Sequence, residues 1–160
     1  IKNFGIWDEE LIKDVGANAK MNEFQAAMGL CNLRHIDREL AKRKAVVEHY
    51  NERLSGVNGL KISAPQKDVK PNYAYYPVIF EPEEFGKSRD EIYELLKVNE
   101  IYARKYFYPL TNTFECYKGM FDMGDTPVAL DLSKKVLTLP LYADLRIDQV
   151  DRICDIILGR

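Results

Sequence analysis

The sequence predicts an α+β fold, in which a small mixed or antiparallel sheet is covered on one face by helices. Apolar residues recur with helical spacing over residues 22–54, 88–99 and 148–160, and short runs rich in β-branched and aromatic residues lie between these stretches. The 160 residues suffice for one domain, and 46% hydrophobic with 30% charged residues is typical of a folded protein. This pattern does not define the order of the strands.

The N-terminal third contains an irregular segment and a long helical pattern. Residues 1–21 are predicted to be irregular, and Phe4 and Trp7 are then exposed unless they pack on another part of the protein. Asn22 can cap the helix that follows, with Gln25 at capping-box spacing. The pattern from 22 to 54 exceeds an average helix, so a kink between two helices is expected at 30–36. Gly56 or Gly59 then supplies a left-handed residue after the helix.

The middle of the chain predicts strands around one helix. Residues 60–62 form a short strand candidate, and residues 73–80 are dense in aromatic and β-branched residues. Pro77 lies inside the second run and favours an edge strand or a bulge. Ser88 and Glu91 form a capping box for the helix that follows. Residues 101–108 are predicted to form a further strand that ends before Pro109.

The C-terminal third predicts a loop, a helix, a strand and a last helix. Residues 110–125 are expected to be a loop, residues 126–135 a helix and residues 136–139 a strand. The last helix is strongly amphipathic and is expected to be capped by Asp148. Cys31 and Cys154 fall within helical apolar patterns, so both are predicted to be core residues.

Composition excludes several classes of protein. A formal charge of −2 argues against a surface that binds nucleic acid, and the densest basic stretch, 34–44, is interleaved with acidic residues. The three cysteines are far apart and have no CxxC spacing, so neither a metal site nor a disulfide framework is predicted. No apolar run has the length of a membrane span, so we expect a cytoplasmic protein without a membrane partner.

Residues 16–30 combine a Gly/Asn loop, a cation and a helix start rich in small residues. A capped helix with a small-residue face explains Ala26, Ala27 and Gly29, but not the loop residues before it. The stretch resembles the DegT/DnrJ/StrS family of pyridoxal-phosphate-dependent nucleotide-sugar aminotransferases, which read G-x-N-x-[RK]-M-x-E-x-Q-A-A-x-G-L here. The matching residues are Gly16, Asn18, Lys20, Met21, Glu23, Gln25, Ala26, Ala27, Gly29 and Leu30.

Two later blocks extend the resemblance to nearly the whole chain. Residues 99–110 are similar to the family pattern gI-x-[AT]-R-x-Y-[FH]-x-P-L, and residues 137–142 resemble its closing L-x-L-P-L/M-Y segment. The resemblance implies substrate-binding roles for Lys20, Arg104, Tyr106 and Tyr108, with Lys105 a further cationic donor. An aromatic strand with one buried face is the other interpretation of both tyrosines. Many relatives have a histidine in residues 99–110, which this sequence lacks, so no histidine-mediated step is carried over.

The cofactor implied by the resemblance is pyridoxal 5'-phosphate. Family members bind it through a Schiff-base lysine that precedes a glycine-rich turn, and no lysine here has that context, so we assign no catalytic residue to this chain. In the family, an asparagine equivalent to Asn18 reaches the cofactor phosphate of the neighbouring subunit, which implies cofactor binding by Asn18 and a homodimer. The alternative for Asn18 is a turn residue with positive φ.

The sequence therefore predicts the C-terminal part of an aminotransferase that acts on a keto nucleotide sugar, with glutamate as amino donor. Residues 1–21 would be an arm at the junction with a missing N-terminal domain, and residues 22–160 would be the small C-terminal domain of a fold-type-I enzyme. Such a fragment is expected to be inactive alone. A deoxysugar dehydratase of the same family and a non-catalytic binding or dimerisation module are the alternatives, and the upstream sequence would separate all three.

Overall fold

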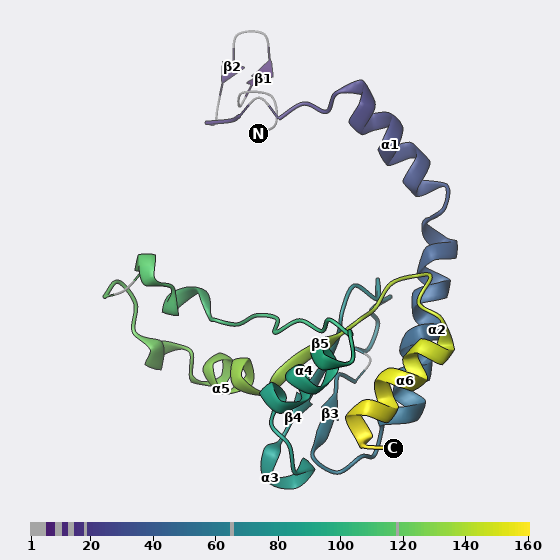
Figure 1. The fold of residues 1–160 in the computed structure, drawn as a ribbon. Helices are drawn as coiled ribbons and strands as arrows, with labels where there is room; N and C mark the ends of the chain where they lie inside the picture. The colour runs from purple at the N-terminus through teal and green to yellow at the C-terminus, as the bar shows by residue number, and fades with distance from the viewer. Residues whose placement is uncertain (1–5, 9–10, 13–14, 18, 65, 118) are drawn as a thin grey trace. The chain divides into compact units, whose positions relative to one another are not determined.

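The computed structural model describes residues 6–8, 11–12, 15–17, 19–64, 66–117 and 119–160 (Figure 1). The chain divides into two compact units, residues 1–38 and 39–160, and each is described by itself. The boundary between these units falls inside helix α2 (Ile36–Leu54). The predicted division into an arm over 1–21 and a domain over 22–160 stays a prediction.

The first unit contains a short hairpin and helix α1. Strands β1 (Ile6–Asp8) and β2 (Leu11–Ile12) pair antiparallel, so the prediction that residues 1–21 are wholly irregular is wrong. Helix α1 (Glu23–Leu33) begins with the predicted capping box: the Gln25 N–H donates to Asn22 Oδ1 at 2.9 Å, and the Asn22 N–H donates to Gln25 Oε1 at 3.1 Å.

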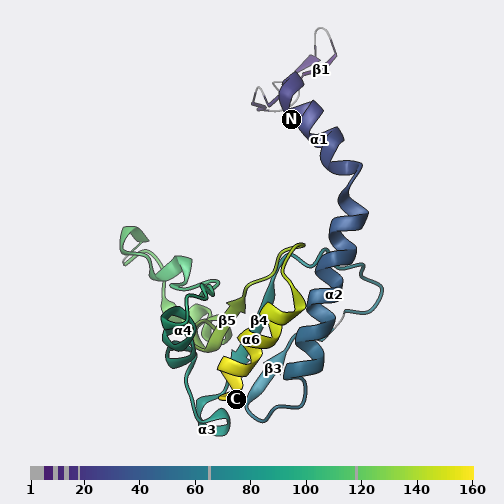
Figure 2. The same ribbon diagram turned by 45° about the vertical axis from the view of Figure 1, so that its right-hand side comes forward.

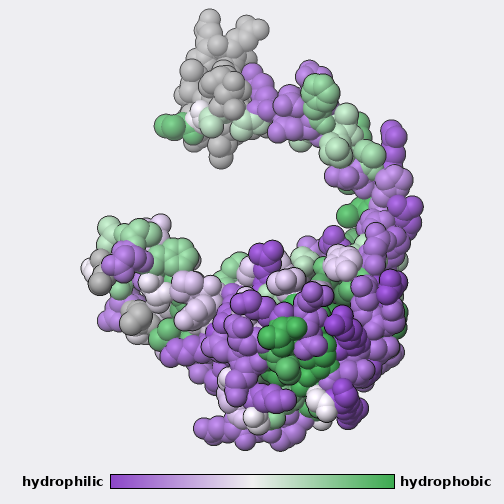
Figure 3. Space-filling model, viewed as in Figure 1, coloured by the Kyte–Doolittle hydropathy of each residue, from purple (hydrophilic) through white to green (hydrophobic). Residues whose placement is uncertain are grey.

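Helix α1 exposes its apolar side chains, which lie on the surface in Figure 3. None of its residues is buried in the described structure. Cys31 is exposed, so its predicted core position is wrong: within the described part of the first unit, no element covers this part of α1. The expected break between two helices at 30–36 is confirmed, since α1 ends at Leu33 and α2 begins at Ile36.

The second unit is built on an antiparallel sheet in the order β3-β4-β5. Its strands are β3 (Leu60–Ile62), β4 (Tyr76–Phe80) and β5 (Val136–Leu139). Helices α2, α4 (Arg89–Val98) and α6 (Ile147–Leu158) bury residues in one core with the sheet, and Figure 2 shows α6 in front of β4. Along β4, Tyr76, Val78 and Phe80 are buried and the residues between them are half-buried, as expected for a sheet with helices on one face. The α+β prediction is confirmed.

Pro77 lies in the central strand, which contradicts the predicted edge or bulge. It lies opposite Thr138 of β5, but the two residues exchange no hydrogen bonds. The Thr138 N–H donates to the Arg104 oxygen at 2.8 Å, and the Thr138 oxygen accepts from the Arg104 N–H at 2.9 Å. The backbone nitrogen of Pro77 therefore points toward β3, and β3 ends at Ile62, opposite Val78. No ladder hydrogen bond is lost, because the missing donor would point past the end of β3.

The strand predicted over residues 101–108 is not formed. Arg104 makes a single isolated bridge with Thr138 of β5, and its neighbours leave the sheet at once. Beyond this segment, the described residues form three 3-10 turns, Thr111–Thr113, Glu115–Tyr117 and Met123–Asp125, before helix α5 (Pro127–Lys135). The helix predicted over 126–135 is thus confirmed, and the loop predicted over 110–125 is partly helical.

Glycines and caps fix the remaining connections. Gly56 and Gly59 both have positive φ, 74° and 75°. A Cβ at Gly59 would lie 2.3 Å from the backbone nitrogen of Phe85, in helix α3 (Pro82–Phe85), so only glycine fits there. Helix α6 begins after Arg146 rather than Asp148, which lies in the first turn and pairs with the Arg146 guanidinium at 2.8 Å. The predicted cap at Asp148 is therefore wrong, because the helix begins at Ile147 and Asp148 already lies inside its first turn.

Candidate functional site

An open hollow of about 680 Å³ lies beside Tyr93 of α4, along the segment that follows this helix, residues 102–114. We call it the aromatic hollow, because phenol and phenyl rings form most of its wall. Arginine and lysine are the charged residues of its lining, and no carboxylate is found among the described lining residues. The lining residues are Tyr93, Tyr102, Ala103, Arg104, Lys105, Tyr106, Phe107, Tyr108, Pro109, Thr111 and Phe114.

A hollow of similar volume, about 650 Å³, lies between α2 and residues 62–77. Its wall is mostly apolar, with Lys44 as its cation and Glu48 beside it in the same lining. Lys44 Nζ lies 3.5 Å from Glu48 Oε1, so this hollow presents no unbalanced charge. The aromatic hollow is therefore the better candidate for an anionic ligand.

Arg104 is the exposed cation of the aromatic hollow. Its backbone is held by the two hydrogen bonds to Thr138, so the side chain starts from a fixed point on β5. Its guanidinium carbon lies 5.9 Å from the centre of the Tyr106 ring. Within the part of the chain that the structure describes, no carboxylate pairs with Arg104. Its planar donors suit the bidentate binding of phosphate oxygens.

Lys105 has a different environment from Arg104. Its Nζ pairs with Asp90 Oδ1 and lies 4.4 Å from the centre of the Tyr93 ring. This hydrogen bond from Lys105, together with the charge of Arg89, lowers the pKa of the Asp90 carboxyl, so the pair stays ionised at neutral pH. The charge of Lys105 is therefore balanced by Asp90 within the protein. Its role as a donor to the ligand stays a prediction.

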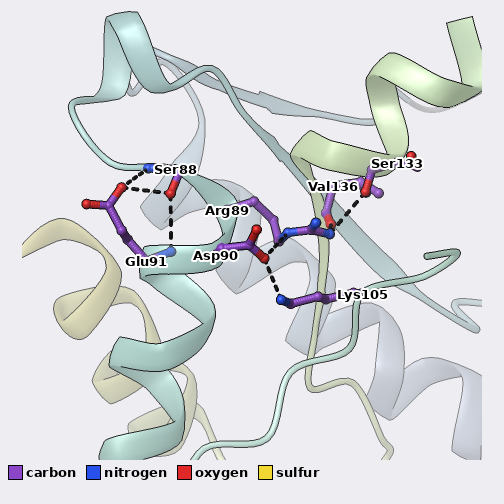
Figure 4. Close-up of polar contacts among 7 residues, drawn as sticks. All are labelled: Ser88, Arg89, Asp90, Glu91, Lys105, Ser133 and Val136. Atoms are coloured by element: carbon purple, nitrogen blue, oxygen red, sulfur yellow. Dashed lines mark hydrogen bonds and ion pairs between the residues drawn. The ribbon is translucent and has the colours of Figure 1, made fainter. Parts of the chain in front are cut away.

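Arg89 is a buried cation at the start of α4, with 2% of its surface exposed. Figure 4 shows its guanidinium between α4 and the turn from α5 into β5. Its Nη1 donates to the carbonyl oxygens of Ser133 and Val136, each at 3.1 Å. The Nε lies 2.8 Å from Asp90 Oδ1, but its N–H is not aligned for a hydrogen bond, so this contact is ionic. The guanidinium carbon also lies 5.0 Å from the centre of the Tyr108 ring.

Tyr106 and Tyr108 line the hollow in different ways. Tyr106 is half-buried, with its ring 5.5 Å from that of Tyr75 in an edge contact and 5.2 Å from that of Phe107 in a stack. Tyr108 is 53% exposed and has Arg89 below its ring. Neither lies on a strand, so the strand interpretation of these tyrosines is wrong.

The predicted site residues fall into three groups. Arg104, Tyr106 and Tyr108 come together in the aromatic hollow. Lys20 is exposed and belongs to the first unit, and its role in substrate binding stays a prediction. Asn18 lies outside the described residues.

Three residues of this region did not emerge from the sequence pattern: Arg89, Asp90 and Tyr93. One signal for Arg89 was present. A cation in the first turn of a helix opposes the helix dipole, and Arg89 follows the N-cap Ser88 directly. The unfavourable interaction of such a cation with the helix dipole has to be offset by other contacts. For Arg89 these are the hydrogen bonds to the carbonyl oxygens at the α5–β5 turn.

The described residues offer neither a metal-binding cluster nor a membrane-spanning helix. They contain no group of three or more His, Cys, Asp or Glu side chains that could hold a metal ion. None of the helices that the structure describes is long and apolar enough to cross a membrane.

Comparison with known proteins gave matches over the whole chain. Residues 1–158 match the DegT/DnrJ/EryC1/StrS aminotransferase family. The chain is 40% identical to a dTDP-4-amino-4,6-dideoxy-D-glucose transaminase from Escherichia coli, over 100% of this chain and 43% of that protein. It is 27% identical to a GDP-perosamine synthase from Vibrio cholerae, over 89% of this chain and 38% of that protein.

A solved structure shares the fold. The crystal structure of DesI in the presence of its TDP-sugar product superimposes with a TM-score of 0.83 at 28% identity, over 98% of this chain and 40% of that one. The chain thus spans about two fifths of the length of the relatives it matches.

Proposed function

The chain belongs to the DegT/DnrJ/EryC1/StrS aminotransferase family, and on this premise we propose that it is the C-terminal part of an aminotransferase acting on a keto nucleotide sugar. The relatives named above act on or make amino sugars carried by dTDP or GDP, which supports this substrate class. Glutamate as amino donor, a homodimer and a cytoplasmic location stay predictions.

The observation that carries the proposal is Arg104 in the aromatic hollow. An exposed guanidinium with no described carboxylate partner, among exposed phenol rings, matches the two parts of a nucleotide sugar. The guanidinium can bind the diphosphate, and the rings can stack on the base or the sugar and donate to hydroxyls. We therefore assign Arg104, Tyr106 and Tyr108 to the substrate.

The cofactor of the whole enzyme would be pyridoxal 5'-phosphate, which acts as an electron sink when bound. Its pyridinium nitrogen needs an acidic partner, and the described lining of the aromatic hollow has none. The hollow therefore fits the phosphates and hydroxyls of the substrate better than the cofactor ring. In this proposal the residues of this chain bind and orient the nucleotide sugar, and Asn18 donates its amide to the cofactor phosphate.

The experiment is an assay of the full-length protein with pyridoxal 5'-phosphate, glutamate and a panel of 4-keto and 3-keto nucleotide sugars. Mass spectrometry should show a product in which an amine replaces the keto oxygen. A deoxygenated product without nitrogen would indicate the dehydratase instead. No turnover of any member, with no binding of the nucleotide sugars, would favour the non-catalytic module.

A further inference from the structure

Two residues at the start of α4, Arg89 and Asp90, connect three parts of the second unit. We call this pair the α4 anchor. The Arg89 guanidinium donates hydrogen bonds to the carbonyl oxygens of Ser133 and Val136 at the α5–β5 turn. The same guanidinium lies over the ring of Tyr108. Asp90 holds Lys105, the residue that follows Arg104 (Figure 4).

We propose that the α4 anchor positions the substrate-binding segment 104–108, acting through Lys105 and Tyr108 without touching the substrate. This inference rests on the proposed function, which supplies the substrate. The contacts between the α4 anchor and residues 104–108 do not depend on that function. The segment has no sheet ladder beyond the bridge at Arg104, and its other described backbone bond is from the Tyr108 N–H to the Lys105 oxygen, at 2.8 Å. Side-chain contacts therefore have to hold the turn that carries Tyr106 and Tyr108.

The charges of the anchor fit this role. Arg89 is almost fully buried and its two carbonyl partners are neutral, so Asp90 is the anion beside it. The same oxygen of Asp90 faces both Arg89 Nε and Lys105 Nζ, so one carboxylate bridges the buried and the half-buried cation. A carboxylate shared in this way fixes Lys105 relative to α4, and leaves Arg104 as the cation that faces the ligand.

The direct test is Asp90→Asn in the full-length protein, because Asp90 is exposed and its loss does not open the core. Glu94→Gln is the matched control: it makes the same change on the same helix, at a residue whose partner Lys97 also belongs to α4. Amide hydrogen exchange is measured for both variants. We expect exchange of the Tyr108 amide, which donates to the Lys105 oxygen, to be about two- to fivefold faster in Asp90→Asn, and unchanged in Glu94→Gln. The Arg104 amide should stay protected, since β5 holds it.

Kinetics then separate positioning from direct contact. Asp90→Asn should raise KM for the nucleotide sugar about two- to fivefold with kcat nearly unchanged. If Lys105 instead bound the substrate itself, releasing it from Asp90 would lower KM, and the proposal would be wrong. Lys105→Gln combined with Asp90→Asn should be no worse than Asp90→Asn alone, because the Lys105 contact is already broken in that variant.

Each remaining outcome also gives a decision. Unchanged exchange of the Tyr108 amide in Asp90→Asn overturns the anchor, whatever the kinetics show. Faster exchange with unchanged KM and kcat overturns its role in substrate binding. If the wild-type protein converts no nucleotide sugar, the proposed function fails, and the exchange data still decide whether the anchor holds the segment.

Discussion

The core of the second unit and the aromatic hollow contain the same residue types in opposite surroundings. In the core, Tyr50 is fully buried and its hydroxyl donates to the Pro140 oxygen at 3.0 Å, and Arg89 has 2% of its surface exposed. In the hollow, Tyr108 is 53% exposed and Arg104 faces solvent. In the core, the Tyr50 hydroxyl and Nη1 of Arg89 have hydrogen-bond partners within the protein, whereas Tyr108 and Arg104 in the hollow are open to a ligand.

This difference has an energetic cause. A buried hydroxyl or guanidinium costs free energy unless it is bonded, so the core accepts such groups only with partners in place. The hollow can leave its cation without a carboxylate because water solvates it until a ligand displaces the water. Burial and partners, rather than residue type, separate the residues that stabilise the fold from those that we assign to binding.

The largest effect should come from truncating a ring in each region. Phe80→Ala removes a fully buried side chain from β4 and should lower the free energy of unfolding by about 3–5 kcal/mol. Phe107→Ala removes a ring that is 70% exposed and should change stability by less than about 0.5 kcal/mol. Urea unfolding of the full-length protein measures both. Similar losses for the two variants would contradict the comparison.

Asn18 poses the same choice between folding and binding. As a ligand of the cofactor phosphate, Asn18→Ala should weaken cofactor binding by about 1.5–3 kcal/mol and leave the apo melting temperature unchanged. A turn residue with positive φ would lose stability instead, at unchanged cofactor affinity. Asn18→Gly is the control, since glycine keeps the turn and removes the amide. Wild-type behaviour of Asn18→Gly in both assays would exclude the phosphate role.

Removing one hydroxyl from each region gives a smaller effect. Tyr50→Phe leaves the Pro140 oxygen without its donor and should cost about 1 kcal/mol of stability. Burial raises the pKa of Tyr50, so this hydroxyl stays protonated in the native protein. Tyr108→Phe should leave thermal stability unchanged and raise KM for the nucleotide sugar. Both variants are measured by thermal unfolding and by steady-state kinetics. A loss of stability in Tyr108→Phe together with a raised KM in Tyr50→Phe would contradict the account.

The pH dependence of the Asp90 contact should be the smallest effect. Because its pKa is lowered in the folded protein, Asp90 contributes stability above its ordinary pKa of 3.8, and this contribution is lost as the pH falls through the lowered value. Since Asp90 is exposed, the contribution should be a few tenths of a kcal/mol. The difference in unfolding free energy between wild type and Asp90→Asn should be constant above about pH 5 and vanish in stronger acid. If this difference in unfolding free energy changes between neutral pH and pH 5, a titratable group other than Asp90 causes the pH dependence.

Local signals in the sequence predicted much of this fold. The capping boxes at Asn22 and Ser88, the strand at 136–139 and the last helix depend on neighbours a few residues away. The grouping of Arg104, Tyr106 and Tyr108 followed from the family resemblance, and the structure places all three in one hollow.

Other features depend on distant residues, which local patterns do not define. The aromatic run at 101–108 satisfies the local preference for a strand, but its bridge to β5 stops at Arg104. Pro77 is accepted in the central strand because β3 ends before it. The contacts of Arg89 lie 44 and 47 residues away in the sequence, at Ser133 and Val136. Such positions become known only once the chain is folded.

The central claim is that Arg104 binds the diphosphate of the nucleotide sugar. Calorimetric titration of the full-length protein with dTDP-glucose tests it most directly, because this sugar has no keto group to react. Arg104→Gln should weaken binding about ten- to hundredfold, as expected for the loss of a charge-assisted contact. Arg146→Gln, which removes an exposed arginine outside the aromatic hollow, should bind like wild type. Wild-type affinity of Arg104→Gln, or an equal loss in both variants, would contradict the claim.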